Sequence, residues 1–190
     1  MRLFNQALLA RQAWRLIQFP DTLCAYVLKA KYYPNGSLID TVFSGNGSST
    51  WHAIEYGLEL LKQGVIWRVG NGTRIRAWRD PWIPRDTNLR PSSAKGRCRF
   101  RWVADFLQAN GEWDMQRLQL YFNNDDISAI LKIKTSRRNE EDFIAWHPDK
   151  HGIFSVKSAY RLTLSKTMMD QDRGATSSRP DGERPYWKFI

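Results

Sequence analysis

The period of the hydrophobic pattern changes at residue 64, and this change limits the folds that the chain can adopt. Before that point, apolar residues recur every three or four positions, which is the spacing of one face of a helix. After it, short apolar runs are separated by glycine, proline and asparagine, which is typical of strands and turns. We therefore expect a mainly α fold with short antiparallel β elements, in the α+β class.

Three amphipathic helices are expected in residues 1–64. The first ends before Pro20 and has its apolar face at Leu3, Ala7, Ala10, Trp14 and Ile17. The second begins at a cap on Asp21 and reaches about Tyr33, with its inward face at Leu23, Tyr26, Val27 and Ala30. The third follows a loop, is capped by Ser49 or Thr50, and buries Trp51, Ile54, Leu58 and Leu61.

Two β-hairpins are predicted further along the chain. The apolar runs 65–69 and 73–78 flank Gly70-Asn71-Gly72, a strong turn signal. The second hairpin joins residues 143–146 to residues 153–156 through a turn over 147–152. Short helices are expected near 103–107, 115–122, 127–133 and 158–164, with caps at Asp114 and at Asp125 or Asp126.

These elements divide the chain into five segments. Residues 1–64 form a helical segment, residues 65–84 a Trp/Arg-rich hairpin, and residues 85–101 a mobile basic linker. Residues 102–164 hold helices and the second hairpin. Residues 165–190 are rich in Asp, Arg, Ser and Pro and are expected to be disordered.

The positive charge of the chain is concentrated in one block. The net charge is +10: residues 67–101 hold ten Arg and Lys against two Asp and give +8, residues 1–66 give +2, and residues 102–190 sum to zero. Such a block favours a polyanion as partner, most simply nucleic acid. The alternative interpretation is a solvated basic surface with no partner.

Arginines and tryptophans alternate within this block. Guanidinium and aromatic groups together suit RNA or another single-stranded nucleic acid, through phosphate contact and base stacking. The candidate binding residues are Trp67, Arg68, Arg74, Arg76, Trp78, Arg79, Trp82, Lys95, Arg97, Arg99 and Arg101. The alternative is a hairpin whose tryptophans fill a core while its arginines extend along the surface.

No catalytic site, metal site or cofactor site is predicted. Asp125-Asp126 follows Tyr121-Phe122 at the wrong spacing for a polymerase palm motif, and a helix cap explains the pair better. His147 and His151 have the spacing of a zinc pair on a helix, but Pro148 and Gly152 indicate a turn. No glycine-rich phosphate loop is present.

The chain is expected to be intracellular, nuclear or cytoplasmic, with no contact with a membrane. No apolar run reaches the roughly 18 residues that a membrane helix needs, and Gln and Arg interrupt the N-terminal apolar stretch. Cys24 and Cys98 stand far apart and fit a reducing compartment.

An ordered set of motifs resembles the region that follows the polymerase thumb in plant LINE-type (non-LTR) retrotransposon reverse transcriptases. The segment Phe4-Asn5-Gln6-Ala7-Leu8-Leu9-Ala10-Arg11-Gln12-Ala13-Trp14-Arg15 resembles the start of that region. Later blocks resemble its K-x-K-Y-Y (29–33), S-x-W (49–51), G-x-x-W-R-V-G-N-G (64–72) and W-x-D-x-W-(L/I)-P (78–84) motifs. Residues 142–146 and 152–160 resemble D-x-x-x-W and G-x-F-S-V-K-S-A-Y, which lead into the zinc-binding domain of the family.

The resemblance implies a connector in a polyprotein that copies RNA into DNA. Its partners would be RNA and the polymerase and zinc-binding segments of the parent protein. The polymerase aspartates, the zinc ligands and the ribonuclease H carboxylates of the family have no counterpart in this sequence, so none of those activities is assigned to a residue here. We expect a non-catalytic, nucleic-acid-contacting fragment, and the alternative is a vestigial or structural fragment with no binding activity.

Overall fold

The computed structural model describes residues 2–41, 47–86, 88–135 and 138–176. The elements are the helices α1 (Arg2–Gln18), α2 (Leu23–Tyr32), α3 (Ser49–Gly64), α4 (Met115–Tyr121), α5 (Asn124–Ile130) and α6 (Val156–Thr176), the 3-10 turns η1 (Leu38–Asp40) and η2 (Val103–Phe106), and the strands β1 (Val65–Arg68) and β2 (Phe143–Trp146). The expected mainly α, α+β class is confirmed.

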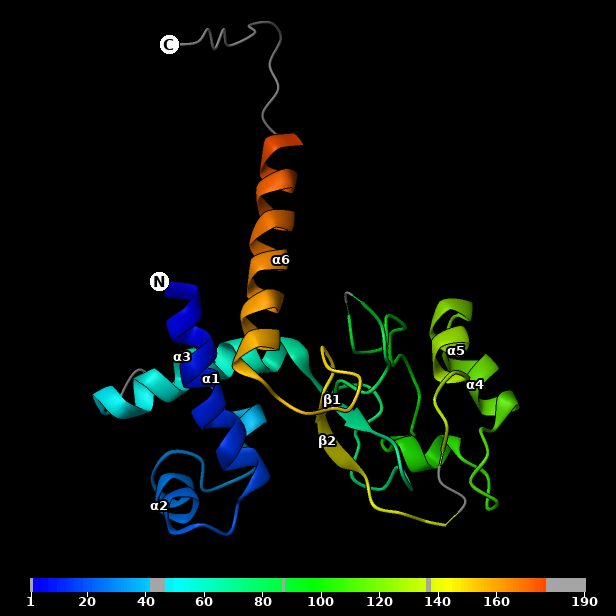
Figure 1. Cartoon of the computed structure of the whole chain (residues 1–190). Helices are drawn as coiled ribbons and strands as arrows, with labels where there is room; N and C mark the ends of the chain where they lie inside the picture. The colour runs from blue at the N-terminus through cyan, green and yellow to red at the C-terminus, as the bar shows by residue number, and fades with distance from the viewer. Residues whose placement is uncertain (1, 42–46, 87, 136–137, 177–190) are drawn as a thin grey trace, which may run out of the picture.

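Two regions lie on either side of a small sheet (Figure 1). We call residues 2–64 together with α6 the helical region, and residues 69–135 the loop-rich region. Each region has its own cluster of buried apolar side chains, and β1 pairs with β2 between them. Helix α6 packs at its base on α1 and α3 and then projects away from the rest of the chain (Figure 1).

Small residues bring α1 and α3 into close contact. Ala7, Ala10 and Ala13 on α1 are completely buried. A Cβ atom on Gly57 of α3 would lie 2.4 Å from the backbone carbon of Leu9, so the helices cross backbone to backbone at this glycine. The predicted inward faces of α1 and α3 are confirmed, because Trp14, Trp51, Leu58 and their neighbours are buried.

The predicted inward face of α2 is wrong. Leu23, Tyr26 and Val27 are 79%, 56% and 58% exposed, whereas Ala25 is buried and Leu28 is partly buried. Thr22 caps the helix rather than Asp21, and its hydroxyl accepts the N–H of Ala25. Both faces of this short helix are apolar, so the sequence pattern did not distinguish the buried one.

The two predicted hairpins do not form. Instead, β1 from the first predicted hairpin pairs antiparallel with β2 from the second, in the register Val65 opposite Trp146 to Arg68 opposite Phe143. Local turn signals predict pairing between neighbours in sequence. Here the apolar side chains Val65, Ile66, Ala145 and Trp146 are buried only when the distant strands combine.

Gly70-Asn71-Gly72 is a loop that wraps around a buried carboxylate. Asp142 is 1% exposed, and its oxygens accept the N–H groups of Gly70 (2.7 Å), Gly72 (2.8 Å) and Arg74 (2.9 Å). Gly72 has φ +73°, and a Cβ atom there would lie 2.5 Å from the nitrogen of Ala104. The glycines therefore serve this close approach rather than a two-strand turn.

Helix α6 is longer than predicted. It continues through Thr176, so residues 165–176 of the expected disordered tail are helical. The rest of that tail, residues 177–190, lies outside the described residues. Among the helices that the structure describes, none has the length and apolarity to cross a membrane.

Candidate nucleic-acid interface

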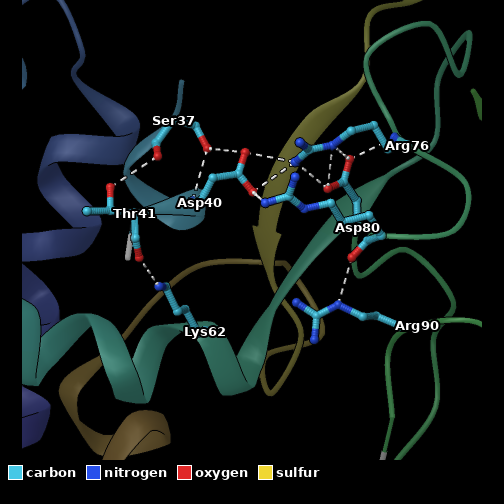
Figure 2. A network of polar contacts seen from close by, with 8 residues as sticks. Ser37, Asp40, Thr41, Lys62, Arg76, Asp80 and Arg90 are labelled. Atoms are coloured by element: carbon cyan, nitrogen blue, oxygen red, sulfur yellow. Dashed lines mark hydrogen bonds and ion pairs between the residues drawn. The ribbon is translucent and has the colours of Figure 1, made fainter. Parts of the chain in front are cut away.

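Arg76 joins the two regions through a network of ion pairs (Figure 2). Its guanidinium donates to both oxygens of Asp40 in η1, at 2.9 and 2.8 Å, and to Asp80 at 2.7 Å. Asp80 also accepts the backbone N–H of Arg76 at 2.7 Å and is only 5% exposed. Hydrogen bonds from the guanidinium to Asp80 raise the pKa of Arg76, against the effect of burial, and Asp40 raises it further.

This predicted binding residue is therefore already neutralised by two carboxylates. Its geometry indicates a connection between the regions more than an open contact for phosphate. Arg79 is exposed and lies 3.7 Å from Asp40, and Arg90 donates to the carbonyl oxygen of Arg79 at 2.7 Å. Lys62 of α3 donates to the carbonyl oxygen of Thr41, and burial lowers the pKa of Lys62 (Figure 2).

The three tryptophans of the predicted site contribute to packing. Trp82 is 1% exposed and donates its indole N–H to the carbonyl oxygen of Ala77. Trp78 stacks on Phe122 with a centroid distance of 4.7 Å and donates to the carbonyl oxygen of Phe100. Trp67 is half-buried, with the guanidinium of Arg74 5.9 Å from its ring centroid. For Trp78 and Trp82, the structure agrees with the alternative of tryptophans that fill a core.

The segment predicted as a mobile linker is attached to the loop-rich core. Leu89 and Cys98 are buried, and the carbonyl oxygen of Leu89 accepts the N–H groups of Trp82 and Ile83 at 2.8 and 2.9 Å. The linker prediction for residues 85–101 is therefore wrong for the described residues 88–101. Polar residues and arginines at the surface concealed the buried anchors in the sequence.

Asp126 holds the middle of this segment. It is fully buried and accepts the N–H groups of Ser92 (3.1 Å) and Ser93 (2.8 Å), both serine hydroxyls, and the guanidinium of Arg85. Burial by itself raises the pKa of Asp126, but the hydrogen bonds from Ser93, Ser92 and Arg85 outweigh it and lower the pKa to about 2. The predicted capping role is wrong, since Asn123 caps α5 and accepts the N–H of Asp126 at 2.7 Å.

Four basic residues follow this anchored point and remain at the surface. Lys95, Arg97, Arg99 and Arg101 are all exposed. Their side chains form no hydrogen bond or ion pair with any other residue in the described parts of the chain. Their charges are therefore available to an external anion, in contrast to the charge of Arg76.

The two histidines that have metal-pair spacing lie in a turn. His147 contacts the carbonyl oxygen of Arg85 through Nε2 at 3.0 Å, and His151 donates its backbone N–H to Asp149. Burial lowers the pKa of His147, an effect that the carbonyl of Arg85 opposes and the charge of Arg68 reinforces. Across residues 2–176, with the gaps given above, no three His, Cys, Asp or Glu side chains cluster as metal ligands would.

The motif residues of the resemblance contact one another in space. Trp51 of the S-x-W block stacks on Tyr32 of the K-x-K-Y-Y block, with a centroid distance of 4.2 Å. Asp142 of the D-x-x-x-W block binds the glycines of the G-N-G block. Trp146 packs edge to face against Phe154 at 4.9 Å. These blocks therefore form the internal framework of the fold.

Comparison with known proteins finds two relatives from Arabidopsis thaliana. One, named "Uncharacterized mitochondrial protein", is 39% identical over 88 residues, which is 46% of this chain and 57% of that protein. The other, named "Putative ribonuclease H protein", is 31% identical over 172 residues, which is 83% of this chain and 26% of that protein. No protein-family model matches the chain, and no solved structure matches it. The chain is thus similar to about a quarter of one curated relative and to somewhat more than half of the other.

Proposed function

We propose that this chain is a non-catalytic connector that contacts nucleic acid within a larger retrotransposon-type reverse transcriptase protein. The observation that carries the proposal is the set of exposed cations Lys95, Arg97, Arg99 and Arg101, whose side chains have no partner among the described residues. Such groups supply the electrostatic part of nucleic-acid binding by neutralising phosphates.

The anchored backbone makes this set a defined surface. Asp126 fixes Ser92 and Ser93, and the segment then forms bridges to residues 75–77, where Arg101 accepts the N–H of Ala77 at 2.9 Å. The backbone that carries the cations is therefore hydrogen-bonded to the loop-rich region at Ser92, Ser93 and Arg101, so less conformational entropy is lost when a phosphate backbone binds. RNA or another single-stranded nucleic acid in an intracellular, nuclear or cytoplasmic setting is the partner that we expect.

Two observations support a place in a larger protein. The chain aligns with only 26% of the relative whose name contains ribonuclease H. In addition, Leu23, Tyr26 and Val27 on α2 form an exposed apolar face, and such faces are typical of surfaces that another part of a protein covers. Polymerase and zinc-binding segments, as implied by the motif resemblance, are the neighbours that we propose.

A salt titration of RNA binding tests the proposal. If about four phosphates are neutralised, log affinity for single-stranded RNA should fall against log salt concentration with a slope near −3, at roughly 0.7 per contact. Changing Lys95, Arg97, Arg99 and Arg101 to Gln should flatten that slope by most of its value while the circular dichroism spectrum stays unchanged.

A control with the same loss of charge uses exposed cations outside the basic block, namely Arg11, Arg15, Lys29 and Arg161 changed to Gln. This control should retain most of the slope. Equal loss in both variants would show diffuse attraction and no defined surface. A folded wild-type chain that fails to bind RNA at low salt would support the alternative, a structural or vestigial fragment.

A further inference from the structure

A groove of about 550 Å³ lies beside the two-stranded sheet. Its walls come from β1, from residues 132–135 after α5, and from Glu140, Glu141 and Phe143 at the start of β2. The lining combines cations with aromatic and aliphatic side chains: Arg68, Lys132, Lys134, Phe143, Trp67 and Ile133. Its volume is in the range of pockets that hold small organic ligands.

Phe143 places an exposed aromatic ring at this groove. It is 62% exposed, and in the sheet it lies directly opposite Arg68. Residues opposite each other in an antiparallel pair project from the same face with Cβ atoms about 5 Å apart. A planar group in the groove would therefore meet a ring and a guanidinium side by side.

The cations of the groove are unpaired within the part of the chain that the structure describes. The side chains of Arg68, Lys132 and Lys134 form no hydrogen bond or ion pair with any residue in the described parts of the chain. Glu140 and Glu141 are the acidic residues of the lining, and Glu141 is paired with Arg74 at 3.4 Å. The positive side chains of the lining thus outnumber the negative ones by one, without counting Arg74.

We propose that this groove binds one nucleotide of a single-stranded nucleic acid, with its base stacked on Phe143 and its flanking phosphates at Arg68, Lys132 and Lys134. The inference rests on the proposed function, because it assumes that the chain meets nucleic acid. Stacking on an aromatic ring requires an unpaired base, so the groove selects single strands over duplex. Lys132, Lys134 and Phe143 lie outside the basic block, and only the tertiary structure brings them to Arg68.

The test measures the affinity of the full chain for a fluorescent ten-nucleotide single-stranded RNA and for a duplex of the same sequence. Phe143→Ala should weaken binding of the single strand about tenfold, as expected for the loss of one stacked base, and should change duplex binding by less than twofold. Phe143→Tyr should bind like wild type. Phe143→Leu keeps an apolar side chain but removes the ring, so it should show the same loss even if the alanine variant folds poorly.

The lysines are tested in parallel. With Arg68, Lys132 and Lys134 added to the four cations at 95–101, about seven phosphates would be neutralised and the wild-type slope would be near −5, at roughly 0.7 per phosphate. Changing Lys132 and Lys134 to Gln should then flatten that slope by about 1.4. The matched controls are Phe19→Ala, which removes another exposed phenylalanine, and Lys29 with Lys157 changed to Gln. The controls should leave affinity within twofold of wild type.

The possible failures are distinguishable. If wild type binds RNA but Phe143→Leu binds equally well, the groove proposal is overturned and the proposed function stands on the residues at 95–101. If the Phe143 variants lose duplex binding as much as single-strand binding, the ring does not stack on a base. If wild type binds neither form, both proposals fall.

Discussion

The helical region and the loop-rich region provide acceptors for their backbone N–H groups in different ways. In the helical region, backbone N–H groups are satisfied inside α1, α3 and α6, and the buried side chains are apolar except for Glu55, from small alanines at helix crossings to the ring of Trp14. The loop-rich region has few regular elements and many N–H groups that no helix or sheet accepts. Carboxylates accept several of these groups, alongside loop carbonyl oxygens, and Asp142, Asp126 and Asp105 each bind at least two backbone N–H groups.

This difference shows what an aspartate can do in a core. A buried charge is costly unless it is paired or well hydrogen-bonded. One carboxylate with several N–H donors meets that condition and fixes a loop at the same time. Side chains thus perform in the loop-rich region the role that regular secondary structure performs in the helical region.

The largest expected effect comes from removing the carboxylate that holds the G-N-G loop. Asp142→Ala leaves three N–H groups without their acceptor and should lower the free energy of unfolding by about 3–5 kcal/mol. Urea denaturation followed by tryptophan fluorescence measures this. Asp21→Ala, an exposed aspartate of the helical region, serves as the control and should cost less than about 0.5 kcal/mol. An effect of Asp142→Ala as small as the control would remove the contrast between the two regions.

The corresponding weak point of the helical region is a glycine. Gly57→Ala places a Cβ atom within 2.6 Å of three backbone atoms of Leu9 and Ala10, so α1 and α3 must separate. We expect a loss of about 3 kcal/mol, at the upper end for overpacking. Thermal unfolding followed by circular dichroism at 222 nm is the measurement. The control Gln63→Ala, on the exposed side of α3, should unfold at the same temperature as wild type. If Gly57→Ala also unfolds at the wild-type temperature, the two helices do not cross this closely.

Acid should weaken the loop-rich region through Asp126. The pKa of this carboxyl is about 2 in the folded chain and 3.8 at its ordinary value. Because the folded value is the lower one, the stabilisation is fully present above about pH 5, and it is lost as the pH falls from about 4 to 2. It amounts to about 2 kcal/mol.

A comparison of wild type with Asp126→Asn isolates this effect from the other carboxylates. Unfolding free energies at pH 6 and at pH 2.5 should show a smaller loss in the variant, by most of that amount. Parallel pH dependence of the two proteins would contradict the assigned role of Asp126.

The smallest effect is expected at the junction between the regions. Arg76→Gln removes the ion pairs to Asp40 and Asp80 and should cost about 1–2 kcal/mol, since Arg76 and Asp40 are partly exposed and the buried Asp80 keeps the backbone N–H at position 76 as a donor. Asp40→Asn should cost less than Arg76→Gln, because Asp40 is the more exposed of the two carboxylates. Equilibrium urea unfolding at low and high salt measures both. The reverse order would show that Asp80 contributes little to the connection.

Sequence patterns predicted only part of the candidate site, because they do not show which side chains are buried or paired. The charge count located the basic block, but it did not separate Arg76, which two aspartates neutralise, from Arg97 and Arg99, which have no partner among the described residues. Tryptophans among arginines suggested stacking on bases, whereas burial assigns Trp82 to the core. No sequence pattern indicated that Phe143 belongs to a binding surface, because its place beside Arg68 follows from the pairing of β2 with β1.

The sequence by itself determined the helices of the first 64 residues and the overall α+β class. These features depend on contacts three or four residues apart, so a local pattern contains them. The predicted caps at Asp21 and at Ser49 or Thr50 are wrong, because Thr22 and Ser48 cap α2 and α3. Only the tertiary structure decided which strands pair, which face of α2 is buried, and that Asp142 and Asp126 organise distant loops. These outcomes depend on partners roughly 30 to 80 positions away. They arise because the fold must bury apolar side chains and also provide an acceptor for each buried N–H group. Spacing between neighbouring residues contains no information about such distant partners.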